Sequence, residues 1–334
     1  MSKTSRYSIS CAVALAILVI SARASAHEVL VANEGSQTLS VIDLRSGTIS
    51  TVALPIAPHN VQVGSDGRIY VVGMPGTGPM DSMPAMKQAP GRLLVFSPNH
   101  TAGEPLLNVP IGVHPAHVVV NSQGTFAYVT VFGESSVAVV DRSGSIVSRI
   151  KVGSAPHGLR LSADGRRLYV ANMEDDSLSV IDTFARREIA RIKVGRTPVQ
   201  VAVAPNGRYV YVTLSGADAV AFVDVVAHRV VEKISVGRSP AQIFLSATGT
   251  LVVANQGTRA SPDSTTTLID APSRRIVATL QTGSGSHGVV GDNSGHYAYV
   301  TASFANTITV IDLRHRQVTR RYHVGERPAG ISYW

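Results

Sequence analysis

The sequence contains a single cysteine. It is Cys11, which lies within the first 26 of the 334 residues. Because those residues have the features of a leader that is removed on export, we expect the mature protein to have no thiol. Disulfide bonds, thiolate metal sites and covalent attachment of a c-type haem are therefore excluded for the mature chain.

Charged residues and long apolar runs are also scarce. Asp, Glu, Lys and Arg make up 16% of the chain. The net charge of +8 comes from basic residues dispersed along the sequence, which favours anionic partners only weakly and does not indicate nucleic-acid binding. After the leader, no apolar stretch approaches the roughly 18 residues that a membrane-spanning helix needs. We therefore expect no transmembrane segment in the mature chain.

Residues 1–26 have the pattern of a signal peptide. Lys3 and Arg6 precede the apolar run Cys11–Ile20, and Ala24-Ser25-Ala26 supplies the small residues of a cleavage site. The run is too short to cross a bilayer. We predict export to the periplasm, with residues 27–334 forming a single domain.

A repeated unit fills the rest of the chain. In its clearest copy, residues 152–193, apolar β-branched segments alternate with polar turns, and Asp164-Gly165 is a hairpin signal. The expected strands are Gly158–Ser162, Leu168–Ala171, Ser177–Ile181 and Glu188–Lys193. This pattern predicts an antiparallel meander of four strands.

The unit recurs at a nearly constant spacing. Gly153, Gly195 and Gly237 stand 42 residues apart, and Gly283 and Gly325 continue the series after 46 and 42 residues. A four-stranded repeat of about 40–45 residues is typical of a propeller blade.

Counting the copies gives seven blades. Six begin near Pro58, Pro115, Pro156, Pro198, Pro240 and Ser286. The remaining blade combines three strands within residues 28–54 with a last strand at Arg327–Tyr333. We predict an all-β, seven-bladed β-propeller of four-stranded antiparallel blades, whose ring closes where the N-terminal strands pair with a C-terminal inner strand. We expect it to be a monomer.

Short motifs recur at the same place in several blades. They are Tyr169-Val170-Ala171-Asn172, the Tyr-Val-Thr triplets at 128–130, 211–213 and 299–301, and the Val-Ile-Asp triplets ending at Asp43, Asp182 and Asp312. By these motifs the chain resembles the YVTN family of β-propellers, including the periplasmic YncE-like proteins. The resemblance implies the fold but leaves function open, because this scaffold serves binding proteins, relatives of lactonases and haem d1-type domains. We expect the aspartates to be structural, because a carboxylate before a turn accepts backbone N–H bonds.

Histidines gather at one predicted opening of the ring. The loop that enters the first strand of a blade and the loop between its second and third strands lie on one face, which we call the top face. His59, His157 and His287 hold equivalent positions after the entry loop, and His117 lies one position later in another blade. Gln200, Gln242, Arg196 and Arg238 stand on or beside the corresponding loops. We predict all eight as ligand-binding residues at the top-face mouth of the channel.

This set of side chains allows more than one chemistry. Neutral imidazoles bind transition metals such as copper or zinc, and they also bind haem iron. Together with the arginines, the same groups would attract a small anionic ligand. Alternatively, each histidine caps its strand and forms a hydrogen bond with the neighbouring blade. The residues alone leave these alternatives open.

A long insertion, residues 73–92, is expected on the same face in the second blade. It contains Met74, Met80, Met83 and Met86, and methionine thioethers are soft ligands that suit Cu(I). This composition indicates a candidate metal site formed by His59, His157, His287, Met80, Met83 and Met86. The alternative is a flexible lid whose methionines cover an apolar patch or a ligand.

No familiar catalytic motif occurs in the sequence. The patterns G-x-S-x-G, H-E-x-x-H and the P-loop are absent. We expect an exported, non-catalytic binding protein whose partner is a small anionic ligand, a metal or a periplasmic protein. The alternatives are a copper- or haem-linked redox protein with His and Met ligands, a lactonase-like hydrolase by family analogy, and a protein or nucleic-acid interaction platform.

Overall fold

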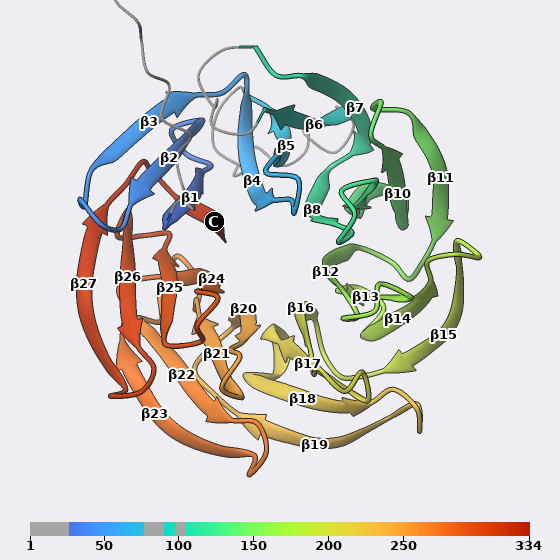
Figure 1. Cartoon of the computed structure of the whole chain (residues 1–334). Helices are drawn as coiled ribbons and strands as arrows, with labels where there is room; N and C mark the ends of the chain where they lie inside the picture. Colours follow the sequence, from blue (N-terminus) through green and yellow to red (C-terminus); the bar gives the residue numbers. More distant parts are fainter. Residues whose placement is uncertain (1–26, 77–89, 98–103) are drawn as a thin grey trace, which may run out of the picture.

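The computed structural model describes residues 27–76, 90–97 and 104–334, and these form a ring of seven four-stranded antiparallel sheets around a central channel (Figure 1). The predicted fold class is confirmed. The predicted signal peptide and Met80, Met83 and Met86 lie outside the described residues. In the described part of the chain, no helix has the length and hydrophobicity that crossing a membrane would require.

Each blade runs from an innermost strand at the channel to an outermost strand at the rim. The innermost strands are β28 (Pro328–Tyr333), β4 (Ile56–Val63), β8 (Pro115–Val120), β12 (Pro156–Leu161), β16 (Pro198–Val203), β20 (Pro240–Leu245) and β24 (Ser286–Gly291). The second strands are β1 (Glu28–Asn33), β5 (Ile69–Pro75), β9 (Phe126–Val131), β13 (Arg167–Asn172), β17 (Tyr209–Leu214), β21 (Thr250–Asn255) and β25 (Tyr297–Ala302).

The third strands are β2 (Thr38–Asp43), β6 (Pro90–Phe96), β10 (Ser136–Asp141), β14 (Ser177–Asp182), β18 (Ala219–Asp224), β22 (Thr265–Asp270) and β26 (Thr307–Asp312). The outermost strands are β3 (Ile49–Ala53), β7 (Leu107–Val113), β11 (Ile146–Lys151), β15 (Arg187–Lys193), β19 (Arg229–Ser235), β23 (Arg275–Gln281) and β27 (Gln317–His323). Two short 3-10 turns, η1 (Phe132–Glu134) and η2 (Ser215–Ala217), follow β9 and β17. The four strands predicted within residues 152–193 are β12 to β15, each within two residues of its expected ends.

The two ends of the chain close the ring. Strand β28 pairs antiparallel with β1 and takes the innermost position of the first blade, as predicted. Beyond the ladder, the backbone N–H of Glu28 donates to the Trp334 carbonyl and that of Trp334 donates to the Glu28 carbonyl, both at 2.9 Å. This pairing covers the edge of β1 that would otherwise face the channel.

The hydrophobic core lies between neighbouring blades. The second and third strands are buried almost throughout, because each sheet packs against a neighbour on both faces, whereas the outermost β15 alternates exposed and covered residues. Phe222 of β18, for example, is fully buried in a cluster with Ile243, Leu251 and Val253 of the next blade. The motif aspartates cap turns as predicted: Asp182 Oδ1 accepts the backbone N–H groups of residues 184 and 185 at 3.0 and 2.9 Å.

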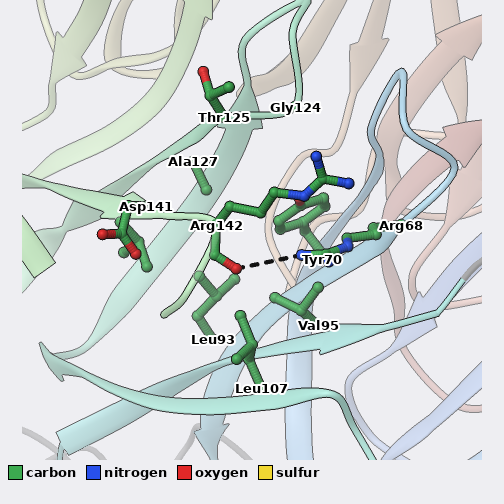
Figure 2. A pocket seen from close by; sticks show the side chains of 11 residues that line it. Arg68, Tyr70, Leu93, Val95, Leu107, Gly124, Thr125, Ala127, Asp141 and Arg142 are labelled. Carbon is green, nitrogen blue, oxygen red and sulfur yellow. Dashed lines mark hydrogen bonds between the residues drawn. The ribbon is translucent and has the colours of Figure 1, made fainter. Parts of the chain in front are cut away.

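The seam between the second and third blades shows this packing in detail (Figure 2). Tyr70 and Leu93 of one blade and Ala127 of the other line a cavity of about 10 Å³. Arg68 Nη1 donates a hydrogen bond across the seam to the Arg142 carbonyl, at 3.4 Å. A space of this size holds about one water molecule, so it belongs to the inter-blade core.

The predicted insertion is shorter than residues 73–92. Strand β5 continues to Pro75, β6 begins at Pro90, and Gly73 pairs with Arg92. The sequence pattern assigned Gly73 to a loop, but it lies in β5 where this strand approaches β4 closely. A Cβ atom at Gly73 would lie 2.1 Å from the Ala57 carbonyl oxygen of β4, so only glycine fits there.

Buried threonines of the Tyr-Val-Thr motif join adjacent blades. Thr213 Oγ1 accepts a hydrogen bond from the Gln200 N–H (3.0 Å) and donates one to the Ala241 carbonyl of the next blade (2.7 Å). Thr301 makes the same bridge between Gly288 and Ala329. The hydroxyl thus satisfies backbone groups that the sheet ladder leaves unpaired.

We predict that Thr213→Val lowers the free energy of unfolding by about 1–3 kcal/mol, because two buried backbone groups lose their partner while the side-chain volume is kept. Thr279→Val, at an exposed position of β23, is the matched control and should change stability by less than about 0.5 kcal/mol. Urea denaturation followed by circular dichroism measures both. Equal stabilities of the two variants would contradict a structural role for the bridge.

Candidate functional site

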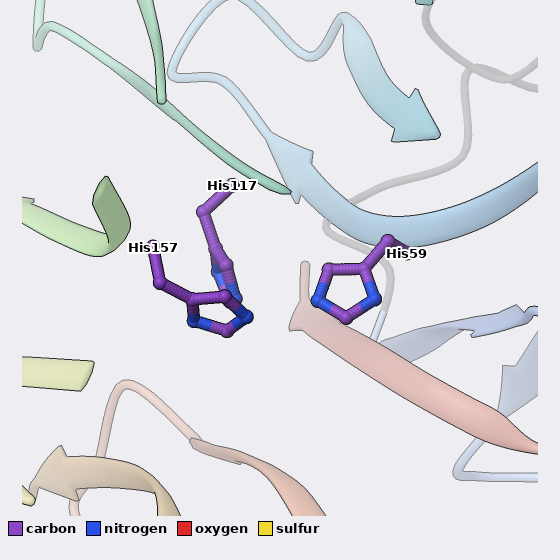
Figure 3. Close-up of side chains that lie close together, drawn as sticks. All are labelled: His59, His117 and His157. Atoms are coloured by element: carbon purple, nitrogen blue, oxygen red, sulfur yellow. The ribbon is translucent and has the colours of Figure 1, made fainter. Parts of the chain in front are cut away.

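Four histidines lie on innermost strands of the ring. His59 is on β4, His117 on β8, His157 on β12 and His287 on β24. Figure 3 shows the imidazole rings of His59, His117 and His157 grouped in the central channel. His117 and His287 are buried, and His59 and His157 are partly buried.

A local irregularity of the backbone positions these side chains. The pairing register shifts between Pro115 and Val118 in β8 and between Pro156 and Leu159 in β12, so that His117 and His157 lie within the shifted segments. His59 and His287 lie in corresponding shifts of their strands. Such bulges bend a strand and redirect a side chain.

Thr130 of the Tyr-Val-Thr motif holds two of the histidines at their backbone. Its Oγ1 accepts a hydrogen bond from the His117 N–H (3.0 Å) and donates one to the His157 carbonyl (2.6 Å). The same bridge that joins the blades therefore sets the distance between two rings in the channel.

The three grouped rings are close enough to share a ligand. Their centroids lie 5.4 Å apart for His59 and His117, 5.4 Å for His59 and His157, and 4.7 Å for His117 and His157. One ring nitrogen from each histidine lies within 4.8 Å of the other two. The His287 ring stands 6.0 Å from that of His59, at the border of this cluster.

The Nδ1 atoms of the rings contact the protein. His59 Nδ1 lies 3.4 Å from Glu34 Oε1, and His157 Nδ1 lies 3.1 Å from the Val199 carbonyl oxygen. His287 Nδ1 lies 3.4 Å from the Ala329 carbonyl oxygen. A carboxylate or carbonyl oxygen at this position accepts a hydrogen bond from Nδ1–H, and the neutral ring then has a lone pair on Nε2. The Nε2 atoms of His59 and His117 are buried and have no hydrogen-bond partner among the described residues.

Burial keeps several of these rings neutral. Desolvation, followed by the charges of neighbouring histidines, holds the pKa of His117 and of His157 well below the ordinary value. Desolvation also lowers the pKa of His287 to about 4. Burial alone would raise the pKa of Glu34, but the hydrogen bond from His59 and the charge of Arg327 lower it overall. At neutral pH the site therefore combines the neutral imidazoles of His117, His157 and His287 with the Glu34 carboxylate.

The structure brings only some of the other predicted residues to the cluster. Gln200 is buried beside it, with Nε2 3.3 Å from His117 Nδ1. Gln242 is buried on β20, and its Oε1 accepts the Val289 N–H at 3.4 Å. The side chain of Arg196 is exposed. Arg238 is also exposed, and its guanidinium binds Ser261 and the carbonyl of residue 262 on the top-face loop of its own blade.

The methionine ligands stay a prediction. Met80, Met83 and Met86 lie outside the described residues. Met74, the fourth methionine of the insertion, is buried in β5, where it pairs with Ala57.

Two residues of the site were not among the sequence predictions. The sequence analysis used Thr130 only as part of the repeat motif, although its hydroxyl group can join backbone groups of two blades. Glu34 directly follows the Val-Ala-Asn segment of the first blade, at the top-face end of β1. That position could have placed Glu34 at the top face, but no signal in the sequence indicated its contact with His59, which is 25 residues away and on another blade.

Comparison with known proteins agrees with the fold and the repeat motifs. Residues 107–249 match the family model described as YNCE-like beta-propeller. This part of the chain is similar to YncE-like β-propellers. The match spans the outer strand of the second blade, the whole third, fourth and fifth blades, and the innermost strand of the sixth. No curated protein matches the sequence.

Several solved structures share the whole propeller. Hydrazine synthase of Kuenenia stuttgartiensis is 20% identical with a TM-score of 0.70, over 84% of this chain and 90% of that one. The periplasmic gluconolactonase PpgL of Pseudomonas aeruginosa is 20% identical with a TM-score of 0.73, over 92% and 99%. A putative 6-phosphogluconolactonase of Bacteroides uniformis is 15% identical with a TM-score of 0.73, over 92% and 100%. At these identities the chain shares their fold, and its own site must be judged from its residues.

We predict that the metal-free protein loses stability as the pH falls from about 6.5 to 4. The pKa of His287 is about 4 in the fold and ordinarily 6.5, so between these values the unfolded state binds more protons than the folded state. The free energy of unfolding then decreases with decreasing pH, by at most about 3 kcal/mol for this residue.

Urea denaturation of chelator-treated protein at a series of pH values measures the effect. His287→Asn should flatten the pH dependence in this range, whereas His296→Asn, at an exposed turn, should leave it as in the unmodified protein. The same slope in both variants would show that the buried ring does not titrate as argued.

Proposed function

We propose that this protein binds a divalent transition metal, Zn²⁺ or Cu²⁺, through one ring nitrogen each of His59, His117 and His157. The observation that carries the proposal is the pair of buried Nε2 atoms on His59 and His117 that have no partner, beside a third imidazole within 4.8 Å. A buried polar atom without a partner costs about 1–3 kcal/mol, and a metal ion at their centre would satisfy both atoms.

The surroundings of the rings support a metal rather than an organic ligand. Imidazole ligands in metal sites almost always donate their other N–H to a carboxylate or a carbonyl, and His59 and His157 have such partners in Glu34 and Val199. Imidazole nitrogen suits zinc and copper, whereas calcium and magnesium prefer oxygen. The ring nitrogens lie within 4.8 Å of one another and need to approach by at most about 1.4 Å, because ligand nitrogens about 2.0–2.1 Å from a tetrahedral metal are roughly 3.4 Å apart.

Glu34 also supplies charge. The three rings are neutral ligands, so a bound divalent ion would bring two positive charges into a partly buried channel. The Glu34 carboxylate, hydrogen-bonded to His59 and 3.7 Å from Arg327 Nη2, offsets part of that charge and raises the basicity of the ring.

The proposed location of the protein is the periplasm. The basic residues, the apolar run and the small-residue cleavage site of residues 1–26 support export. A chain that crosses the inner membrane unfolded would acquire its metal after folding, outside the cytoplasm. Because the metal would bind after folding, the folded propeller must form the site without help from another protein. All three ligands come from its own inner strands, which meets this requirement.

Metal titration of the purified protein tests the proposal. We expect one Zn²⁺ or Cu²⁺ per chain by calorimetry and elemental analysis, and at least about a hundredfold weaker binding in His59→Ala and His117→Ala. Glu34→Gln should weaken binding by about 10–100-fold, because it removes only the partner of a ligand. His296→Asn is the matched control. Absence of stoichiometric metal, or equal binding by all variants, would overturn the proposal.

Metal-assisted hydrolysis of a lactone is a second candidate function. Three imidazoles on one zinc ion leave a coordination position for water or substrate, which is the pattern of catalytic rather than structural zinc sites. Two of the propellers with the same fold are named as lactonases of sugar acids, one of them putatively. These observations favour hydrolysis over the redox alternative, whose methionine ligands lie outside the described residues.

A lactone assay separates the two functions. With glucono-δ-lactone as the substrate, we expect zinc-loaded protein to release acid faster than the metal-free protein and faster than His117→Ala, because a bound metal activates water at neutral pH. A pH-stat measures the rate. If all three forms give the uncatalysed rate while the metal binds stoichiometrically, the protein binds metal without hydrolysing this lactone.

A further inference from the structure

A second chamber lies in the channel, on the bottom-face side of the histidines. Its volume is about 300 Å³. It is lined by residues from the innermost strands of six blades and from the β24–β25 hairpin, among them Gln62, Arg160, Gln242, Phe244 and Asp292. Arg160 follows His157 by three positions on β12, toward the bottom hairpin of that blade. The chamber is therefore distinct from the metal site, although the two are neighbours.

Arg160 has no partner for its charge. Among the described residues, its guanidinium forms no hydrogen bond and no ion pair, although other arginines such as Arg167 and Arg208 are paired with aspartates. Burial lowers the pKa of Arg160, but a guanidinium keeps its charge at neutral pH. A largely buried cation without a counter-ion is costly, and five N–H donors are available for a ligand.

Two amide side chains add unpartnered atoms to the same chamber. Gln242 is 3% exposed, and its Nε2 has no hydrogen-bond partner in the described structure. On β4, the buried Oε1 of Gln62 also lacks one. The chamber therefore offers one cation, one spare donor and one spare acceptor, arranged around an apolar wall that includes Phe244.

The acidic residue of the chamber does not neutralise Arg160. The Asp292 carboxylate is engaged within its own hairpin, where Oδ1 accepts the Tyr297 N–H (3.0 Å) and Oδ2 accepts the Ser294 hydroxyl. No ion pair joins it to Arg160 in the described structure. The positive charge in the chamber thus stays available for an anion.

We propose that this chamber binds one small molecule that carries an oxyanion, either a carboxylate or a phosphate, and that Arg160 is its anchor. The planar guanidinium matches two oxygens of such a group, while Gln242 donates to the ligand and Gln62 accepts from one of its hydroxyl groups. A volume of about 300 Å³ is at the lower end of small-molecule sites, so the ligand is a small molecule rather than a polymer.

Calorimetry with defined probes tests the proposal on the full-length exported protein at low ionic strength. The probes are inorganic phosphate, succinate and the neutral sugar glucose. We expect phosphate or succinate to bind one per chain and glucose not to bind, and the stronger of the two anions identifies the class of oxyanion. Arg160→Gln should weaken the binding at least about tenfold, and Arg160→Lys should weaken it less because the charge is kept.

The control variant removes one arginine charge from the same blade but at a distance from the chamber. Arg187→Gln, on the exposed outer strand β15, should bind the anion as the unmodified protein does. Circular dichroism and the thermal midpoint verify that each variant is folded. If neither anion binds, or if Arg160→Gln and Arg187→Gln bind it equally, the proposal is wrong.

A further comparison separates this chamber from the metal site. Chelator-treated protein and the variant His117→Ala should still bind the anion, and Arg160→Gln should still bind one metal ion per chain. Loss of anion binding on removal of the metal would place the anion on the metal and overturn the chamber site. Loss of metal binding alone would leave the chamber proposal intact.

Discussion

The pairing of β28 with β1 is the interaction on which the rest of the structure depends. A propeller blade has two faces to bury, and it can bury both only when the ring is complete. Because the C-terminal strand supplies the innermost position of the blade that the N-terminus begins, closure fixes the circumference and with it the separation of all seven inner strands. The distances between the histidine rings follow from that geometry rather than from any contact local to one blade.

Closure also explains why polar side chains can sit unpaired in the channel. The large apolar clusters between blades stabilise the ring, so individual positions at the channel can carry the cost of buried polar atoms without unfolding the domain. In the threonine bridges, the backbone groups freed by the bulges are satisfied by Thr130, Thr213 and Thr301. Among the described residues, the Nε2 atoms of His59 and His117 and the guanidinium of Arg160 are not satisfied in this way, and such groups are typical of binding sites.

The two ends of the channel carry different side chains, and the fold does not require this difference. Neutral imidazoles and the Glu34 carboxylate stand toward the top face, and an arginine with two amides stands below them. The histidine cluster is suited to a cation, and the chamber that contains Arg160 is suited to an anion. Propellers of the same fold carry names as different as hydrazine synthase and gluconolactonase, so the fold by itself does not determine a function.

The sequence by itself determined the fold: the 42-residue spacing, the hairpin turns and the Tyr-Val-Thr triplets predict seven blades, because each is a local or periodic signal. It also placed four histidines on one face, because equivalent positions in equivalent repeats share a location. It did not separate His59, His117 and His157, which meet, from Arg196 and Arg238, which are exposed on the loops that enter β16 and β20. Only the tertiary structure decided this, together with the partners of Glu34, Thr130 and Arg160, because bulges at the start of the inner strands and contacts between blades far apart in the chain set the direction of each side chain.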